Sequence, residues 1–473
     1  MIAFDVFLIT GATVLLCIAH WRAGLIAILA LGFALDPLRK LVEGEPLYFS
    51  GLVFVLVAAT LVGSRVRKVR LSLRPIFAWN SALRVPLILF LLLVVIQSAA
   101  AFARTGSAVI ALIGLIAYMA PIPGVLLGYA YARSTADVTK LVQWYVGLAA
   151  VMTAGVYLSR FGYDWDVLGA VGVGLVAYSP TGQRLQLASG FFRTPEVAAW
   201  HTAMATCLVI MLFLSRRRLL AHVWSTSALG LYFVIALMFT GRRKGIVEIA
   251  LFVVAYLLLI AYFRRRALKT ALLLAAVCLA TVAVVAVTQI GDALGIASYY
   301  ARGTDIGMTE ADRYQRMSVG ALRFVIRRNG WLGAGAGTGS QGAQYFGGGS
   351  SLVGRSSEGG VGKVVAELGV PGLVALLLLG VTAARHLWTI AREASRRGHR
   401  KAHYAYGLIA FLFANAVLFA VAHQIFGDPL VLYVIGVVFG MALAVPHMRE
   451  GAPPPPRERS APREAPTPAG LPR

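Results

Sequence analysis

The sequence predicts an all-α, polytopic membrane protein with about 12 transmembrane helices and a long extracytoplasmic loop. Of its 473 residues, 59% are hydrophobic and only 14% are charged, a composition typical of integral membrane proteins. Apolar runs of roughly 20 residues, the length that a helix needs to cross about 30 Å of hydrocarbon, recur from end to end. The basic residues gather in loops on one side of these runs, as the loops of an oriented membrane protein do.

The predicted spans are joined by polar connections. The second span is short and follows the first after only His20, Trp21 and Arg22, so a broken or tilted first hairpin remains an alternative and the side of the N-terminus is open. Spans are predicted near residues 2–19, 22–35, 47–63, 85–103, 108–131, 138–158, 195–214, 222–239, 246–262, 270–290, 361–382, 404–424 and 428–447.

A formal charge of +24 would suggest nucleic acid as a partner if the protein were soluble. Here the basic residues lie in loops between spans, so they indicate how the protein is oriented in the membrane. By the positive-inside rule, the side that carries the basic loops is cytoplasmic. The implied partner is therefore the lipid bilayer, with no nucleic acid. The four basic groups lie at 65–74, 216–218, 264–269 and 392–401.

Four regions follow from this layout. Residues 1–290 form transmembrane helices with short loops and one outer loop near 159–194, and residues 361–448 form the last three spans. Between them, 291–360 is an extracytoplasmic loop with a helix at 309–328 that Thr309 opens. The Pro-rich segment 449–473 is predicted to be a disordered cytoplasmic tail. No internal repeat is visible, so an inverted-repeat transporter gains no support.

Metal and nucleotide motifs do not stand out. The three cysteines lie within predicted spans, which implies neither a disulfide framework nor a metal cluster, and we expect no cofactor. The glycine-rich run after residue 332 follows no strand, so it is not a dinucleotide site. His201, near the outer end of its span, is more often a packed residue than a base.

Arginine is unusually frequent on the predicted outer face. The sequence TGRRKG places Arg242 and Arg243 in a tight outer turn, and the long loop adds Arg313 and Arg316 among others. A single such arginine is best explained by an acidic neighbour or an anionic headgroup. The group as a whole favours an anion site, because the guanidinium fork matches phosphate oxygens and stays charged. The further outer arginines are Arg302, Arg323, Arg327, Arg328 and Arg355.

Two carboxylates lie near the start of the predicted span at 361–382. Glu358 precedes the helix, where it either caps the N-terminus through the helix dipole or has a chemical role. Glu367 lies inside the span, and an intramembrane carboxylate is costly enough to predict a partner, for which a loop arginine is the candidate.

Four segments of the chain resemble the superfamily of bacterial O-antigen ligases and of O-antigen and exopolysaccharide polymerases, which are multi-span glycosyltransferases. TGRRKG at 240–245 is similar to the outer turn of that family, with Arg243 at the arginine position and Arg242 in place of a serine. Residues 312–337 resemble its loop helix, and Arg313 is the match. The segment that Arg184 opens, 184–199, resembles a third motif, with Glu196 in place of an asparagine.

The fourth likeness is at Glu358. Counting back from Gly369 and Gly372 puts Glu358 where the ligases carry a histidine that helps to activate the acceptor. The exchange of histidine for an acid favours the polymerase branch. The resemblance implies a GT-C-like fold in the bacterial inner membrane with its active face outside the cytoplasm. It also implies metal-independent transfer between polyprenyl-diphosphate-linked oligosaccharides, as donor and acceptor.

In this interpretation Glu358 is the catalytic base, and the substrate-binding residues are Arg313, Arg243, Arg242, Arg316 and Arg184. Other polysaccharide assembly proteins are further partners that such an activity implies. A ligase that moves finished glycan to a lipid or protein is the nearest alternative. A lipid-linked sugar flippase and a structural scaffold in a polysaccharide export complex are alternatives of other classes.

Overall fold

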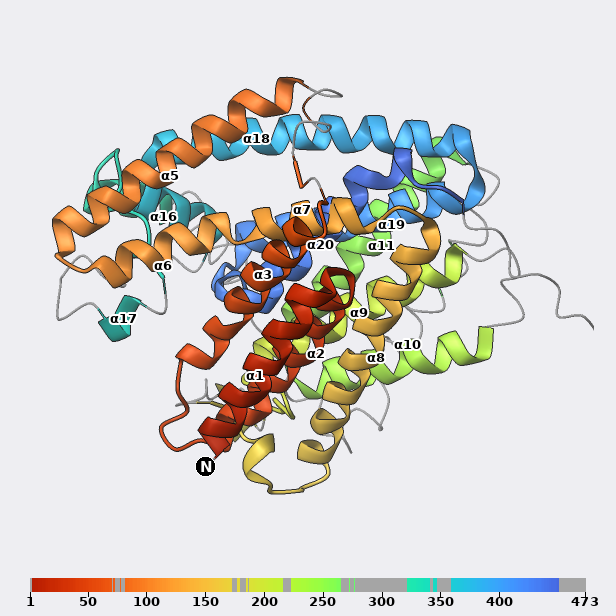
Figure 1. Cartoon of the computed structure of the whole chain (residues 1–473), viewed down its shortest axis with the longest axis horizontal. Helices are drawn as coiled ribbons and strands as arrows, with labels where there is room; N and C mark the ends of the chain where they lie inside the picture. The colour runs from red at the N-terminus through yellow and green to blue at the C-terminus, as the bar shows by residue number, and fades with distance from the viewer. Residues whose placement is uncertain are drawn as a thin grey trace, which may run out of the picture.

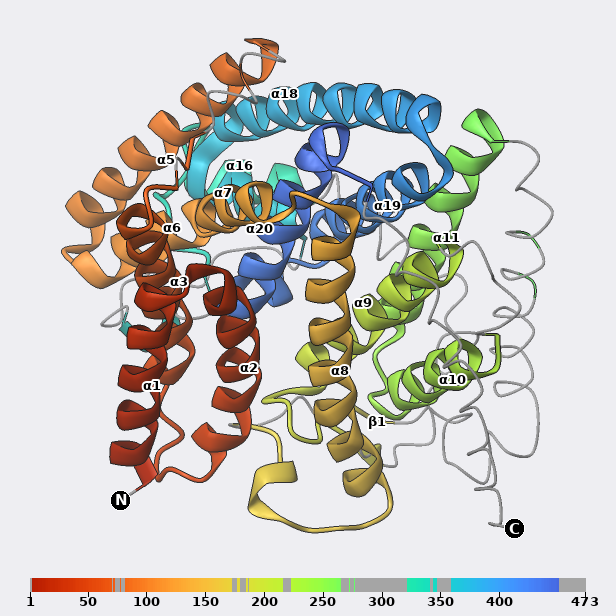
Figure 2. The same ribbon diagram turned by 45° about the vertical axis from the view of Figure 1, so that its right-hand side comes forward.

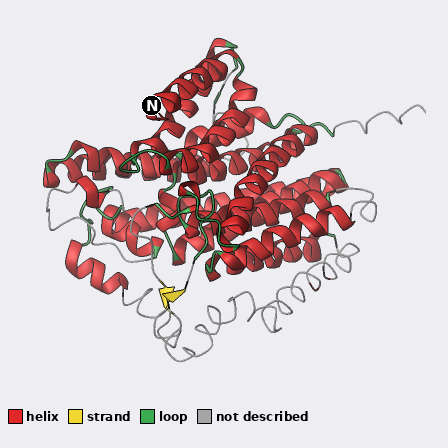
Figure 3. Ribbon diagram, turned by 90° about the horizontal axis from the view of Figure 1, so that it is seen from below, coloured by secondary structure: helices red, strands yellow, loops and turns green. Residues whose placement is uncertain are grey.

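A computed structural model of the chain is all-helical apart from one two-residue ladder, which lies outside the helical body (Figure 3). Of the predicted helix 309–328, only the last part, 321–328, is described. The span at 270–290, apart from residues 272 and 276, and the tail from 451 lie outside the described residues. The structure describes residues 2–69, 71, 72, 77, 81–171, 177, 178, 184, 185, 187–215, 223–264, 272, 276, 321–340, 343–346 and 359–450.

The elements are labelled in Figure 1. The α-helices are α1 (Ile2–Ala19), α2 (Trp21–Lys40), α3 (Tyr48–Val66), α5 (Arg84–Thr105), α6 (Ala108–Met119), α7 (Pro121–Tyr131), α8 (Thr135–Arg160), α9 (Pro195–Leu214), α10 (Val223–Phe239), α11 (Arg243–Phe263), α16 (Ala321–Asn329), α17 (Ala343–Phe346), α18 (Gly360–Arg397), α19 (His399–Val421) and α20 (Pro429–Ala444). Short 3-10 helices are η1 (Ser81–Leu83), η2 (Asp166–Leu168), η6 (Gln424–Gly427) and η7 (Val445–His447), and strands β1 (Ala177–Tyr178) and β2 (Arg184–Leu185) are antiparallel.

Eleven helical segments within the described part of the chain are long and apolar enough to cross a membrane, and the apolar part of α10 is shorter. Together they account for every predicted span except the one at 270–290. This is the architecture of a multi-pass membrane protein. The helices α9 and α20 are the most enclosed, because 89% of the apolar window of each is buried by other parts of the chain.

Two spans differ from their predicted form. The second, predicted as short, is a full helix of 20 residues that continues through Pro37 to Lys40, because its polar last turn finds partners that are described below. The span predicted at 108–131 is two helices, since Pro121 begins a new one. At this second helix, α7, Gly128 and Gly124 bring its backbone against that of α20, where a Cβ on Gly128 would lie 2.3 Å from the oxygen of Val437.

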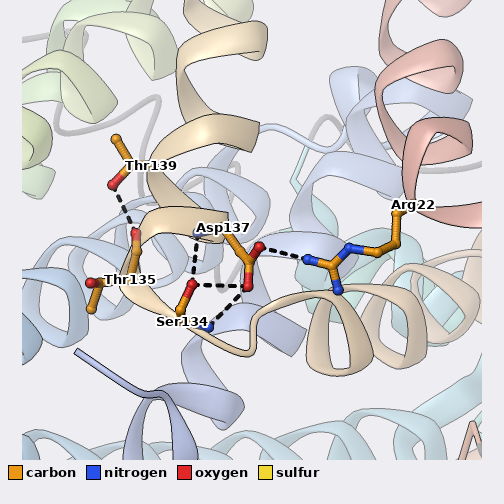
Figure 4. A network of polar contacts seen from close by, with 5 residues as sticks. All are labelled: Arg22, Ser134, Thr135, Asp137 and Thr139. Atoms are coloured by element: carbon orange, nitrogen blue, oxygen red, sulfur yellow. Dashed lines mark hydrogen bonds and ion pairs between the residues drawn. The ribbon is translucent and has the colours of Figure 1, made fainter. Parts of the chain in front are cut away.

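One end of the bundle carries the basic loops. Arg22, in the first turn of α2, pairs with Asp137 at 2.6 Å, and Asp137 completes a capping box with Ser134 at the start of α8 (Figure 4). Arg67 donates to the oxygen of Ala19, and the backbone nitrogen of Arg449 donates to Arg133. These contacts join α1, α2, α3, α8 and the segment after η7 at a shared surface, which we call the basic end.

The opposite end is formed by the other termini of the same helices. Figure 2 shows α1, α2 and α8 side by side, with the loop after α8 at the end away from the basic loops. There Lys40 at the end of α2 binds the segment before α9, and that segment in turn reaches the start of α20. We call this surface the opposite end.

Candidate functional site

The turn between α10 and α11 has a local structure that explains its motif, TGRRKG. Gly241 has φ of +65°, a conformation that favours glycine. Thr240 is buried; its hydroxyl donates to the oxygen of Leu237 and accepts from the backbone nitrogen of Arg242. The tight turn thus sets Arg242 at the N-cap of α11 and Arg243 at its first position, at the opposite end of the bundle.

Arg242 has one acidic partner. Its Nη2 lies 3.0 Å from Oε1 of Glu196 in the first turn of α9, and both side chains are mostly covered, with 18% and 27% of each exposed. The Nε and Nη2 atoms of Arg242 nevertheless have no hydrogen-bond acceptor among the described residues, because the contact with Glu196 has the distance but not the direction of a hydrogen bond. The charge of this guanidinium is therefore balanced by Glu196, while two of its buried N–H groups lack well-aligned acceptors among the described residues.

Arg193 fixes the segment that carries Glu196. Its Nη2 lies 2.6 Å from Oδ2 of Asp428, its Nη1 donates to Ser50, and its backbone nitrogen donates to Asp36 in α2. Burial alone would lower the pKa of this guanidinium, but the carboxylates of Asp428 and Asp36 outweigh burial and raise its pKa above the ordinary value. The other oxygen of Asp428 caps α20 through the nitrogens of Leu430 and Val431, so one charge network joins α2, α9 and α20.

Lys40 holds the same segment from α2. Its ammonium group donates to three backbone oxygens, those of Val167 at 3.0 Å, Gly190 at 2.6 Å and Phe192 at 2.7 Å. Gly190 has φ of +57° and lies against the backbone of α8, where a Cβ would be 2.2 Å from the nitrogen of Val156. The loop before α9 is therefore anchored on both sides.

A second polar region lies at the break in α18. Gly369 has φ of +72° and ψ of −175°, and Pro371 follows it, so the helix hydrogen bonds are interrupted there. The freed oxygens of Ala366 and Glu367 accept from the nitrogens of Ala334 at 2.7 Å and Gly335 at 3.1 Å. The glycine-rich segment 330–340 thus pairs with an unwound part of a transmembrane helix, and its glycines allow the backbones to meet.

Glu367 anchors that segment through its side chain. The fully buried carboxylate accepts from the nitrogen of Gly339 at 2.9 Å and from Tyr118 at 2.6 Å, and Nζ of Lys363 lies 2.8 Å from it. Lys363 also lies over the ring of Tyr118, 4.8 Å from its centroid. The prediction that this carboxylate has a partner is confirmed. The cation that pairs with it among the described residues is Lys363, one turn earlier on the same helix, and not an arginine of α16.

The described part of the long loop presents a basic face. In α16, Val325 is buried against Val365 and Ala366 of α18, while Arg323, Arg327 and Arg328 are exposed. Phe324, Trp331 and Leu332 are also more than half exposed on this part of the chain. Arginine beside exposed aromatic and aliphatic side chains is typical of a helix at the boundary between lipid headgroups and water.

The predicted site residues divide into three groups. Arg242 and Arg243 are described and share the N-terminus of α11. Arg184 is part of strand β2, and its side chain is outside the description. Glu358, Arg313 and Arg316 lie outside the described residues. The N-cap of α18 is Gly359, which makes no side-chain cap hydrogen bond, and the helix-capping role that we considered for Glu358 stays a prediction.

Sequence reasoning missed Arg193 and Lys363. Arg193 directly precedes Thr194, the N-cap of α9, and Pro195. The sequence feature that could have identified it is an arginine placed just before the capping residue and proline that begin a helix. Lys363 lies four residues before Glu367, the spacing of an ion pair on one helix face. His201, which we expected to be packed, is 1% exposed and its Nδ1 bonds to Tyr145, so that prediction is confirmed.

Among the described residues, no three histidine, cysteine or acidic side chains are grouped so that they could hold a metal ion. Comparison with models of known protein families and with curated proteins finds no significant match for the chain.

Proposed function

We propose that the chain is an extracytoplasmic polysaccharide polymerase of the bacterial inner membrane, which joins polyprenyl-diphosphate-linked oligosaccharide repeat units. The observation that carries the proposal is Arg242, a mostly buried guanidinium at the end opposite the basic loops, which is ion-paired with Glu196 and whose Nε has no hydrogen-bond acceptor among the described residues. By the positive-inside rule that end lies outside the cytoplasm. A fixed cation at the membrane surface suits the diphosphate of a lipid-linked sugar.

In the proposed reaction a hydroxyl of the acceptor sugar attacks the anomeric carbon of the donor. The new bond joins the hydroxyl oxygen to that carbon, while the bond from the carbon to the diphosphate oxygen breaks. Glu358 takes the hydroxyl proton, and the diphosphate leaves with the polyprenyl chain. Arg243, Arg242 and Arg313 stabilise the charge that develops on it, and Arg316 and Arg184 are further substrate-binding residues.

Two other features support the proposal. Helix α16, which carries exposed arginines, packs through Val325 on the half of α18 that begins two residues after Glu358. The break in α18 frees backbone groups inside a transmembrane helix, an arrangement that membrane proteins tolerate where irregular backbone is covered by protein or lines a polar site. Here the glycine-rich segment covers it.

The positions of the buried ionisable residues favour an active site at one membrane surface over a transport pathway that crosses the membrane. Glu248 and Glu367 lie five and seven residues from the starts of their helices, or roughly 8 and 10 Å at 1.5 Å per residue. Asp428 caps α20 at the same end. A flippase or other transporter is expected to place ionisable groups at greater depth.

Analysis of the accumulated products tests the proposal in a deletion strain of the host. Loss of a polymerase leaves single repeat units on the final acceptor, and loss of a ligase leaves long unattached chains. Loss of a flippase leaves lipid-linked repeat units on the cytoplasmic side. Unattached long chains would favour the ligase alternative, and unchanged polysaccharide would overturn all three.

A further inference from the structure

The loop that follows α8 exposes three aromatic rings at the opposite end. Phe161, Tyr163 and Trp165 are 67%, 52% and 51% exposed. The rings of Tyr163 and Trp165 lie 5.5 Å apart between centroids and are inclined at 59°, so they form an open, angled pair. The function proposed above uses none of these residues.

This loop is held in place although its aromatic side chains are exposed. The backbone nitrogen of Tyr163 donates to Leu158, and Leu168 is buried. Lys40 donates to the oxygen of Val167, and Ser189 donates to the oxygen of Leu168. A partner that stacks on such fixed rings loses little binding energy to ordering the loop.

The residues between the rings indicate the kind of partner. Asp164 and Asp166 flank Trp165, are exposed, and have no cation within ion-pair distance among the described residues. Aromatic faces carry negative charge density and attract the C–H groups of a sugar ring, while carboxylates accept hydrogen bonds from hydroxyl groups. Paired carboxylates disfavour contact with an anionic lipid surface, where aromatic rings also occur.

The loop is joined directly to the candidate site. The backbone nitrogen of Val171 donates to the oxygen of Arg193, and Arg193 is three residues before Glu196, the partner of Arg242. We propose that Tyr163 and Trp165, with Asp164 and Asp166, form a platform that binds sugar rings of a glycan chain beside the site. The identity of the ligand as a glycan rests on the proposed function.

Binding by the purified full-length protein in lipid nanodiscs tests this platform. The probe is the set of oligosaccharides released from the surface polysaccharide of the host by mild acid, titrated by isothermal calorimetry. We expect W165A and Y163A each to weaken binding about tenfold, and W165F to retain most of it. Trp224→Ala is the matched control, because Trp224 is 87% exposed at the start of α10 and lies outside the platform.

Three outcomes would overturn the platform: no binding by the wild type, equal binding by W165A, or equal losses in W165A and W224A. Quenching by brominated lipids of a fluorescence component that W165A lacks, together with unchanged glycan binding, would assign Trp165 to the membrane interface instead. Because the readout is binding, failure of the platform is distinct from failure of the polymerase proposal, which product analysis tests.

Discussion

Nη2 of Arg242 lies 3.0 Å from Oε1 of Glu196. These are the two positions at which their segments depart from the motifs that they resemble, where the family carries serine and asparagine. The structure brings the two departures together as an ion pair between α9 and α11. A positive charge gained at one position is thus balanced by a negative charge at the other, which explains how both are tolerated in one site.

We expect Arg242→Ser alone to lower polymer formation at least about tenfold, because it removes a cation and leaves Glu196 free to repel the diphosphate. The double variant E196N/R242S removes both charges, so Glu196 no longer repels the diphosphate, and it should recover part of that loss. Polymer yield per protein, quantified after gel separation of the product, measures both effects.

The single variant R242S and the double variant E196N/R242S must reach the membrane in equal amounts for this comparison. The Arg242–Glu196 pair is mostly covered, so thermal unfolding of each variant is measured beside its polymer yield. A double variant no more active than R242S would mean that the two residues do not act as a unit.

Glu367 is predicted to be the most sensitive buried carboxylate. Glu367→Ala removes the acceptor for Gly339 and Tyr118 and leaves Lys363 buried without its partner, and breaking a buried pair costs about 3–5 kcal/mol. We expect a marked fall in the thermal unfolding temperature of the purified protein. The double variant K363M/E367M should be less destabilised than E367A, and an equal or greater loss would show that the lysine is not the reason.

Glu248 provides the contrast. It is fully buried in α11, and neither carboxylate oxygen has a hydrogen-bond partner among the described residues. Because an unpartnered ionisable group in the membrane interior is costly, Glu248→Gln should leave the unfolding temperature unchanged or raise it. A fall as large as that of E367A would mean that Glu248 has a charged role in the folded protein.

Cysteine labelling tests which end of the bundle faces the cytoplasm. In a background with its native cysteines replaced, Asp164→Cys at the opposite end should react with a membrane-impermeant maleimide in intact cells. Arg396→Cys, exposed in the last turn of α18, should react only after the membrane is permeabilised. The reverse pattern would put the candidate site in the cytoplasm and contradict the proposed chemistry.

Much of the fold was predictable because apolar length and basic loops are strong signals, and each predicted span that the structure describes is a helix. The sequence did not predict that the span at 108–131 divides at Pro121 or that the helix after residue 360 is broken at Gly369. Hydropathy does not reveal such breaks, because the residues on both sides of them are apolar. The two-sided anchoring of the loop before α9 was not predictable, because Lys40 and Asp428 are distant from it in sequence and their partners are backbone groups or a single arginine.

The sequence predicted only part of the candidate site. Arg242 and Arg243 were identified from a short motif, and their position at the end away from the basic loops agrees with the predicted layout. The pairing of Arg242 with Glu196 required the packing of α9 against α11. The roles of Glu358, Arg313 and Arg316 remain predictions, since these residues lie outside the described part of the chain.

The central claim is that Glu358 removes the acceptor proton, and one measurement tests it most directly. Purified wild-type protein, Glu358→Gln and the control Glu43→Gln are compared for polymer formed from lipid-diphosphate-linked repeat units, with thermal unfolding to verify folding. Glu43 is an exposed glutamate in the turn after α2, at the opposite end. Since a positioned general base contributes about 10²- to 10⁴-fold, E358Q should lose at least about a hundredfold while E43Q stays active. Polymer of normal length and amount from E358Q would contradict the account.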